Sequence, residues 1–298
     1  MKNIVIVGSK NSGNKNDPSV IAAAFDGEAN CTVIYWEDLL ISVKTGQVEI
    51  ATLGRSLLSF DPDLVIAVGW YKSGKLSLYK DLAYSLALYL ESHRVEFWNR
   101  EMIEQRSTSK LSNMVQLALE GVSVPNSLFS LSLSAHVDLS FPCIVKAVAA
   151  SRGDMNFMVN SQEEFDDIAQ GDSAYLVQPF LPNDHDLRVI CIGGEAQLIL
   201  KRQRSSSSTT HLNNTSQGGS AQWIEMDEVD PQLLTISSKI CKIMSRELAG
   251  IDFIPDESSS YGYSCLEVNA IPQLTSGVDV TKKLTHFRKA TINYLGDR

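Results

Sequence analysis

Gly250-Ile251-Asp252-Phe253 and Leu266-Glu267-Val268-Asn269-Ala270 are two largely apolar stretches that carry three oxygen-bearing side chains. Glu267 and Asn269 are two positions apart, so on a strand their side chains point to the same face. A polar turn beginning at Pro255 separates the stretches, so Asp252 can lie opposite them on a neighbouring strand. Two carboxylates and a carboxamide suit a Mg²⁺ ion that is shared with phosphates. An edge hairpin with solvated acids is the alternative that these residues alone leave open.

The first hundred residues alternate short apolar runs with amphipathic patterns. Such alternation argues for an open, mostly parallel sheet with helices on its faces. We therefore predict an N-terminal α/β domain over residues 1–100. Its expected strands are 4–7, 31–36, 63–68 and 95–99, and its expected helices are 18–25, 48–60 and 79–92.

The remaining two thirds of the chain mix helical patterns with strands that follow one another directly. A polar stretch at 204–219 is rich in Ser, Thr, Asn and Gly, which indicates either a disordered linker or a mobile lid over a site. Expected helices are 101–120, 161–168, 231–248 and 282–295. Expected strands are 127–131, 141–147, 156–159 and 174–180, with a hairpin of 187–192 and 196–201 that turns on Gly193-Gly194.

Charge and composition exclude several classes of partner. The net charge of −9 disfavours a nucleic-acid backbone or an anionic membrane surface, whereas local cations can still meet ATP. The five cysteines show no C-x-x-C or Cys/His spacing, which indicates reduced thiols in a cytosolic protein. No apolar run approaches the roughly 18 residues of a membrane span, and the N-terminal run is too short for a signal peptide. We therefore expect a cytoplasmic protein that binds neither nucleic acid nor membrane.

Five groups of residues that suit nucleotide chemistry follow one another along the chain. The first three are Ser109-Lys110-Leu111 at a helix start, Phe141-Pro142-Cys143-Ile144-Val145-Lys146 as an apolar strand ending on a cation, and the loop Ala150-Ser151-Arg152-Gly153-Asp154. The fourth is Leu176-Val177-Gln178-Pro179-Phe180-Leu181 with Asp184-His185-Asp186-Leu187-Arg188 after it. The fifth joins Lys201-Arg202, the polar stretch and the two acidic strands.

The order of these features resembles the ATP-grasp superfamily, and most of all its RimK-type carboxylate–amine ligases. The resemblance covers the chain from about residue 101 onward. It implies an α+β ATP-grasp fold after the N-terminal α/β sheet, with the nucleotide between two sheets. The implied central lobe is 101–181, and the implied C-terminal lobe with the metal site is 182–298.

For ATP, the resemblance implies contacts from both lobes. Lysines neutralise the phosphates, because a triphosphate brings several negative charges into a partly desolvated cleft. The glycine of a loop closes on the phosphates, the hinge segment meets the adenine edge, and an acid after it accepts the ribose hydroxyls. The implied ATP-binding residues are Lys110, Lys146, Gly153, Gln178, Phe180, Leu181, Asp186 and Lys201.

The resemblance also implies which residues carry the chemistry. One or two Mg²⁺ ions bridge the phosphates, and Mn²⁺ can substitute for them. A cationic side chain lies against the terminal phosphate. The implied metal ligands are Asp252, Glu267 and Asn269, the implied catalytic residues are Arg202 and Asn214, and the implied substrate-facing residues are Arg188 and Gln217.

The implied activity is ADP-forming ligation of a carboxylate to an amine through an acyl phosphate. The substrates would be small molecules or peptides, and similar enzymes are often dimers or tetramers, so a homo-oligomer is allowed. Pro179 replaces a common Glu, and Gln217 stands where relatives often carry a cation. These departures leave a second interpretation open, a catalytically weakened nucleotide-binding regulator. A structural, partner-binding protein is a third, and it predicts no thermal shift with ATP.

Overall fold

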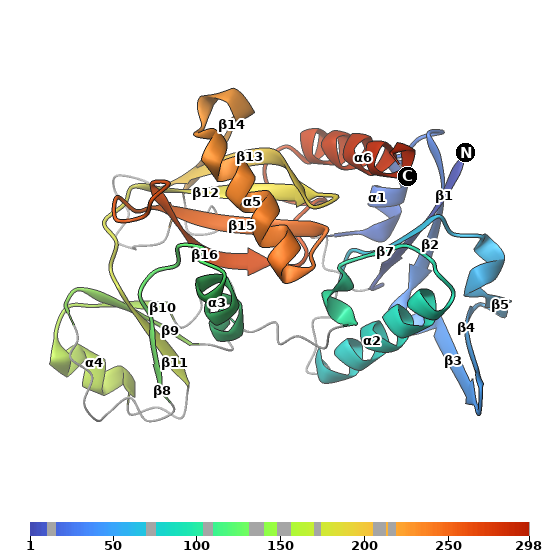
Figure 1. The fold of residues 1–298 in the computed structure, drawn as a ribbon, viewed down its shortest axis with the longest axis horizontal. Helices are drawn as coiled ribbons and strands as arrows, with labels where there is room; N and C mark the ends of the chain where they lie inside the picture. Colours follow the sequence, from blue (N-terminus) through green and yellow to red (C-terminus); the bar gives the residue numbers. More distant parts are fainter. Residues whose placement is uncertain are drawn as a thin grey trace.

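The computed structural model of the 298-residue chain describes residues 1–10, 16–69, 76–103, 110–130, 140–147, 156–169, 174–204, 213 and 219–297. In this part of the chain the strands form four sheets, with helices packed on their faces (Figure 1). One sheet is parallel and the others are antiparallel, so the fold is mixed α/β as predicted.

The N-terminal sheet is parallel, with strand order β2-β1-β6-β7. Its central strand β1 buries Ile4 to Val7 completely, as a strand covered on both faces requires. The four predicted strands and the helices predicted at 18–25 and 79–92 are confirmed. Their observed bounds are β1 Lys2–Gly8, α1 Pro18–Ala23, β2 Ala29–Tyr35, η1 Trp36–Asp38, β6 Leu64–Ala67, α2 Leu76–Ser92 and β7 Phe97–Trp98.

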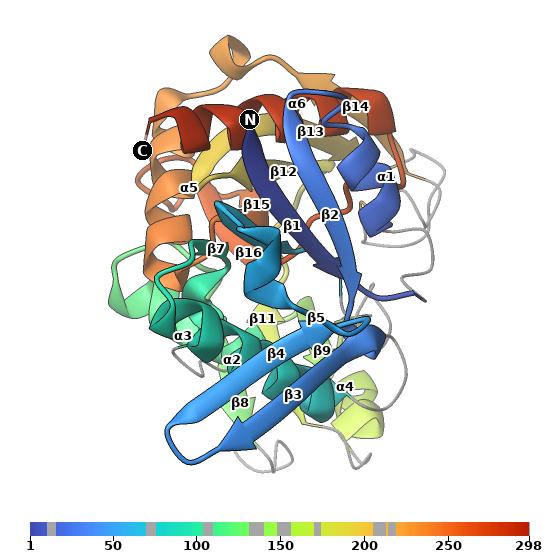
Figure 2. The same cartoon turned by 90° about the vertical axis from the view of Figure 1, so that its right-hand side faces the viewer.

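The helix predicted over 48–60 is wrong, because this segment belongs to a small antiparallel sheet. Two glycines with positive φ, Gly46 and Gly54, turn the chain at either end of β4. Between them Val48, Ile50 and Thr52 alternate with other residues, and such β-branched side chains favour a strand. The elements are β3 Leu39–Lys44, β4 Gln47–Thr52, β5 Arg55–Ser56 and η2 Leu57–Phe60, and the hairpin projects from the body in Figure 2.

The C-terminal helix α6, Val280–Gly296, joins the N-terminal sheet to the last sheet of the chain. Its buried Phe287 shares one apolar core with Ile4 and Ile6 of β1 and with Ile190 and Leu198 of the C-terminal sheet. Figure 1 shows the helix lying between these two sheets. The N-terminal unit is therefore fixed against the C-terminal lobe by a common core.

The central sheet has the order β10-β9-β11-β8 and is antiparallel throughout. Along β9 the side chains alternate: Cys143 and Val145 enter a core under helix α4, and Ile144 and Lys146 leave on the other face. The strands and helix predicted here are confirmed, with bounds β8 Leu128–Ser130, β9 Cys143–Ala147, β10 Asn156–Val159, α4 Gln162–Ala169 and β11 Tyr175–Pro179.

The C-terminal sheet has five antiparallel strands in the order β14-β13-β12-β15-β16. The predicted hairpin turns on Gly193 and Gly194, whose φ angles of 66° and 84° suit a primed turn. Helices α3 and α5 cover one face over a large apolar core. The bounds are β12 His185–Ile192, β13 Glu195–Gln203, β14 Ser220–Ile224, η5 Met226–Glu228, α5 Pro231–Met244, β15 Leu248–Pro255 and β16 Tyr263–Asn269.

One predicted helix is described only in part, and another is shorter than the sequence suggests. The helix predicted over 101–120 is a short turn, η3 Arg100–Met102, and helix α3 Lys110–Leu119, with 104–109 outside the described residues. The helix predicted over 231–248 ends at Met244, because Ser245 takes the left-handed conformation with φ of 51°. Among the described helices, none combines the length and the apolar character needed to cross a membrane.

Candidate active site

A cavity of about 500 Å³ lies between the central sheet and the five-stranded sheet. The open face of β9 and β11 forms one wall, and the face of the C-terminal sheet that is turned away from α5 forms the other. Most of the predicted site residues that the structure describes line this space: Lys110, Lys146, Gln178, Phe180, Leu181, Asp186, Arg188, Arg202, Asp252, Glu267 and Asn269.

Strand register explains why charged residues gather on one face of the C-terminal sheet. Arg188 on β12 is paired with Asp252 on β15, and Asp252 is paired in turn with Glu267 on β16. In the next row, Asp186 is paired with Arg202 on β13. Because directly opposite residues of neighbouring strands share a face, these five side chains stand together on the cavity wall. The predicted adjacency of Asp252 and Glu267 is thus seen in the register.

Ion pairs tie four of these groups together. Arg188 Nε and Nη2 donate to the two carboxylate oxygens of Asp252, both at 2.7 Å. Arg202 Nε donates to Asp186 Oδ1 at 2.5 Å, and its Nη2 lies 3.2 Å from Asp252 Oδ1. The side chains of Asp186, Arg202 and Asp252 are each only 8% exposed, so their charges need these partners to be tolerated.

The pKa values in the cluster follow from burial and from the guanidinium groups. Burial raises the pKa of Asp252, but Arg188 and Arg202 outweigh it, and the net pKa lies below its usual value. Burial also raises the pKa of Asp186, and there the attraction of Arg202 is offset by repulsion from Asp252, so the net pKa stays above its usual value. Asp252 therefore remains a carboxylate at neutral pH.

Two lysines that line the cavity have lowered pKa values, because burial and neighbouring positive charges disfavour their protonated form. Burial and the neighbouring charge of Lys110 lower the pKa of Lys146 to about 8, and the carboxylate of Glu267 opposes that shift. Burial and Arg188 lower the pKa of Lys283 to about 8. Lys283 Nζ donates to the carbonyl oxygens of Gln273, at 2.8 Å, and of Ser276.

The cavity is more positive than the chain around it. Its described lining holds five cationic side chains and three carboxylates, which leaves an excess of two positive charges, whereas the whole chain carries −9. The cations are Lys110, Lys146, Arg188, Arg202 and Lys283, and the carboxylates are Asp186, Asp252 and Glu267. A positive cleft in an acidic protein concentrates anionic ligands.

The residues at the edge of the sheet fit a divalent cation that is shared with a ligand. Asp252 uses about three of its four lone-pair sites on the arginines, so about one remains. Asn269 Nδ2 is buried and has no hydrogen-bond partner among the described residues, so an acceptor such as a phosphate oxygen would satisfy this donor. No group of three His, Cys, Asp or Glu that could hold a metal occurs in the described part of the chain. This donor set therefore fits Mg²⁺ held with phosphates, and not an all-protein cage.

A family model described as the RimK-like ATP-grasp domain matches residues 107–287. The chain belongs to this RimK-like ATP-grasp family. A probable alpha-L-glutamate ligase of Trichodesmium erythraeum (strain IMS101) is 24% identical over 296 residues, which cover 91% of this chain and 93% of that protein. The alpha-aminoadipate--LysW ligase LysX of Sulfurisphaera tokodaii is 29% identical over 188 residues, covering 58% of this chain and 62% of that protein.

A solved structure also shares the ATP-grasp fold. The ATP-grasp ligase PsnB, in complex with a phosphomimetic variant of its minimal precursor, Mg and ADP, gives a TM-score of 0.70 at 16% identity and covers 99% of both chains. The predicted family and the predicted ATP-grasp fold are confirmed. The relatives are named as ligases, in agreement with the predicted enzyme class. The lobe boundaries and the individual residue roles stay predictions.

One residue that the RimK-like resemblance singled out is described but does not line the cavity, and three others lie outside the described residues. Lys201 is next to Arg202 on β13, so its side chain leaves the opposite face of the sheet, and it is absent from the described lining. Gly153, Asn214 and Gln217 lie outside the described residues. Asn213, the described neighbour of Asn214, does line the cavity and donates to Asn183 Oδ1 at 2.7 Å.

The hinge residue Gln178 has its side chain committed within the protein. Its Nε2 donates to Ser127 Oγ at 2.9 Å and approaches Met114 Sδ at 3.5 Å. These contacts fix β11 against the segment that leads into β8 and against helix α3. Phe180 N also donates to Pro142 O, at 3.1 Å, so the hinge commits both of these donors within the protein.

Sequence reasoning missed Lys283 and the loop 272–278, which also line the cavity. Lys283 is 4% exposed and lies four residues before the buried Phe287, so it sits on the apolar face of α6. The sequence signal that identifies Lys283 is a lysine at a position of the helix that otherwise carries apolar residues. Trp223 of β14 was missed as well; it lines the cavity, and its buried Nε1 has no partner among the described residues.

Proposed function

We propose that this chain is an ATP-dependent carboxylate–amine ligase that activates a carboxylate as an acyl phosphate. The observation that carries the proposal is the charged face of the C-terminal sheet, where Arg188, Asp252 and Glu267 form one row opposite Lys146 of the central sheet. Such a row supplies alternating charge for a polyphosphate and for a bridging cation.

The cations divide the task of neutralising the triphosphate. Lys146 and Lys110 reach the cavity from the central sheet and from helix α3, and Arg202 reaches it from β13. In the proposed role, Lys110 and Lys146 bind phosphates of ATP, and Arg202 stabilises charge at the terminal phosphate. Preorganised cations in a water-poor site act on developing charge without having to rearrange.

The chemistry that Mg²⁺ would supply at this site is positive charge that stabilises the transferred phosphoryl group. Glu267, Asn269 and the remaining lone pair of Asp252 are the groups that would hold it. The substrate carboxylate attacks the terminal phosphorus, ADP leaves, and the amine then attacks the acyl carbon and expels phosphate. The chain needs no nucleophile of its own for this sequence.

The class of substrate is proposed from the family. Relatives are named as ligases of glutamate and of α-aminoadipate, and PsnB was also solved with its precursor peptide PsnA2 and AMPPNP. The excess positive charge of the cavity agrees with an amino acid or peptide that presents a carboxylate near Arg188. We therefore propose an amino-acid or peptide carboxylate, with an amine acceptor that stays open.

Phosphate release from ATP and Mg²⁺ in the presence of mixed amino acids and hydroxylamine tests the proposal. Hydroxylamine attacks an acyl phosphate, so a hydroxamate is expected together with ADP. The Glu267→Ala variant is the matched control, and it should give neither. Wild-type protein that shows an ATP-dependent thermal shift but no turnover under these conditions would favour the regulator, and the absence of any shift would remove nucleotide binding altogether.

A further inference from the structure

The strand that carries Glu267 and Asn269 lies at the edge of the five-stranded sheet. Among the described strands, β16 pairs only with β15, and their last register pair is Gly250 with Asn269; Cys265 N of β16 also donates to Ser123 O at 2.9 Å. Edge strands lack a partner on one side and hold their position less firmly. A site that must place ligands to within about 0.5 Å therefore needs support from outside the sheet.

Asn99 supplies one such support at the point where the ladder ends. Its side-chain Oδ1 accepts a hydrogen bond from Leu248 N at 2.9 Å, and its Nδ2 donates to Ala270 O at 2.5 Å. Leu248 begins β15, and Ala270 follows β16, so the amide joins the two strands just beyond their last pair. Asn99 is 1% exposed and holds a positive φ of 58°, a conformation that Asn tolerates better than most residues.

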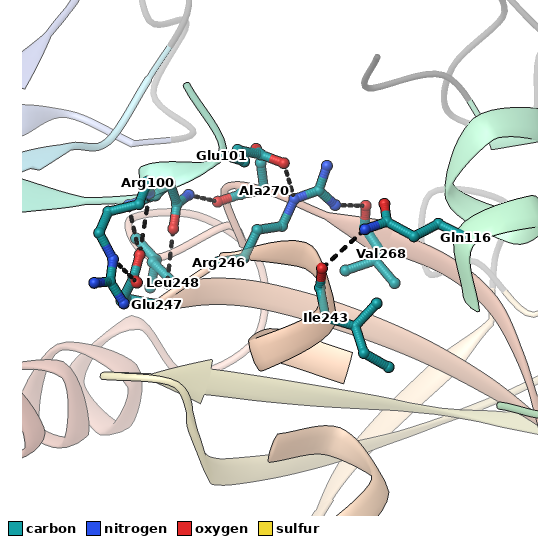
Figure 3. A network of polar contacts seen from close by, with 10 residues as sticks. Arg100, Glu101, Gln116, Ile243, Arg246, Glu247, Leu248, Val268 and Ala270 are labelled. Carbon is teal, nitrogen blue, oxygen red and sulfur yellow. Dashed lines mark hydrogen bonds and ion pairs between the residues drawn. The ribbon is translucent and has the colours of Figure 1, made fainter. Parts of the chain in front are cut away.

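Arg246 supplies the second support. Arg246 is 2% exposed, and its Nη1 donates to Val268 O at 2.6 Å while its Nε donates to Glu101 Oε2 at 2.6 Å. The buried carboxylate of Glu101 therefore aims the guanidinium at the backbone of β16, as Figure 3 shows. A charged donor held by a buried partner makes a strong and directional hydrogen bond.

Asn99, Glu101 and Arg246 together form what we term the carbonyl clamp. The clamp holds the carbonyl groups on both sides of Asn269, because it binds Val268 O before this residue and Ala270 O after it. We propose that the carbonyl clamp positions Glu267 and Asn269 for a divalent cation, an inference that rests on the proposed function. The clamp residues touch neither the cation nor the substrate, so they act through the backbone of β16.

A purely architectural role is the competing explanation, since the same region joins the segment after β7 to the segment before β15. Arg100 provides the contrast. Its Nε donates to Glu247 Oε1 at 2.8 Å, so it strengthens the same junction, and within the described residues its side chain forms no hydrogen bond or ion pair with residues 268–270. Loss of Arg100 should therefore weaken the junction without releasing the two carbonyl groups.

A thermal-shift titration with Mg²⁺ at saturating ADP separates the two roles. The variants are Asn99→Ala, Arg246→Lys and the control Arg100→Ala. Losing an outer partner of a metal ligand typically costs about 10–100-fold in metal affinity. We expect the Mg²⁺ concentration for half of the shift to rise by about 10-fold or more in Asn99→Ala, and by less than about 2-fold in Arg100→Ala. Arg246→Lys keeps the charge but cannot reach both partners, and it should fall between them.

The outcomes distinguish this inference from the proposed function. Equal Mg²⁺ midpoints in Asn99→Ala, Arg246→Lys and Arg100→Ala would overturn the clamp. A wild-type protein that melts at the same temperature with ADP alone and with ADP and Mg²⁺ would instead overturn the metal site. If Asn99→Ala shows no cooperative melting, Arg246→Lys decides the question by the same comparison.

Discussion

Replacing Lys146 with methionine is expected to stabilise the ligand-free protein and to abolish its response to ATP. The cause is the lowered pKa of this lysine, which reflects burial and the nearby charge of Lys110. Lys146 is half-buried in the cavity wall, so its ammonium group is partly desolvated, and a bound polyanion would offset that cost. Methionine keeps the length and the apolar contacts of the stem and removes the charge.

The magnitude follows from the shift itself. The pKa falls from 10.5 to about 8, and each pKa unit corresponds to about 1.4 kcal/mol between the two protonation states. At neutral pH, where Lys146 is still mostly protonated, the charged form therefore costs up to about 3 kcal/mol of folding stability. We expect Lys146→Met to recover a substantial part of that free energy.

The sign of the pH dependence is a separate check. Because the folded-state pKa lies below the unfolded value, the unfolded chain binds more protons between about pH 8 and pH 10.5. The free energy of unfolding of the wild type therefore rises through this window on account of Lys146. The advantage of Lys146→Met should be full below about pH 8 and should shrink toward pH 10.5.

Urea denaturation across this pH range, with Lys44→Met as control, measures the effect. Lys44 is exposed at the end of β3, so its removal should change stability little. In the same variants, ATP with Mg²⁺ should raise the melting temperature of the wild type and of Lys44→Met but not of Lys146→Met. A Lys146→Met protein that is less stable than the wild type at neutral pH, or whose advantage does not change with pH, would refute the reasoning.

Three further outcomes follow from the site. Glu267→Ala should lower Mg²⁺-dependent ADP release by about two to three orders of magnitude, and release at wild-type rates would contradict a ligand role. Arg202→Leu should destabilise the protein by about 3–5 kcal/mol in urea denaturation, because it leaves two buried carboxylates short of a partner; a loss below about 1 kcal/mol would show that Asp186 and Asp252 are solvated. Mg²⁺ without nucleotide should leave the melting temperature nearly unchanged, since the arginines already neutralise Asp252, whereas a large shift would indicate an all-protein metal site.

The parts of the fold that the sequence predicted are those in which a local pattern decides the structure. The continuous apolar run of β1 and the Gly193-Gly194 turn each specify their element within a few residues. The prediction for 48–60 is wrong because the apolar spacing of this segment fits both the helical and the strand period. Turns at two glycines outside the apolar positions favour strands instead. The apolar pattern and the helix propensities of the segment do not reveal these turns.

The site follows the same division. Asp252 and Glu267 are joined by a hairpin, so their adjacency was accessible from their spacing. Lys283 reaches the cavity only because α6 packs between two sheets that are distant in sequence, and no local pattern encodes that contact. The grouping of Lys201 with Arg202 ignored the alternation of a strand, which sends neighbouring side chains to opposite faces.

The arginine pairs on Asp252 have a consequence for how ligands would bind. Two guanidinium groups already neutralise this carboxylate, so the site has little net negative charge with which to bind Mg²⁺ alone. A nucleotide without Mg²⁺ meets the cationic side chains of the cavity but lacks the metal that would contact its phosphates. The nucleotide then supplies negative charge for Mg²⁺, and Mg²⁺ supplies positive charge for the phosphates. Since linkage is reciprocal, the factor by which Mg²⁺ strengthens the binding of ADP must equal the factor by which ADP strengthens the binding of Mg²⁺. The carbonyl clamp would increase this shared factor, because it fixes Glu267 and Asn269. Substitutions that disrupt the clamp should therefore weaken the binding of ADP in the presence of Mg²⁺ and leave the binding of ADP without Mg²⁺ unchanged.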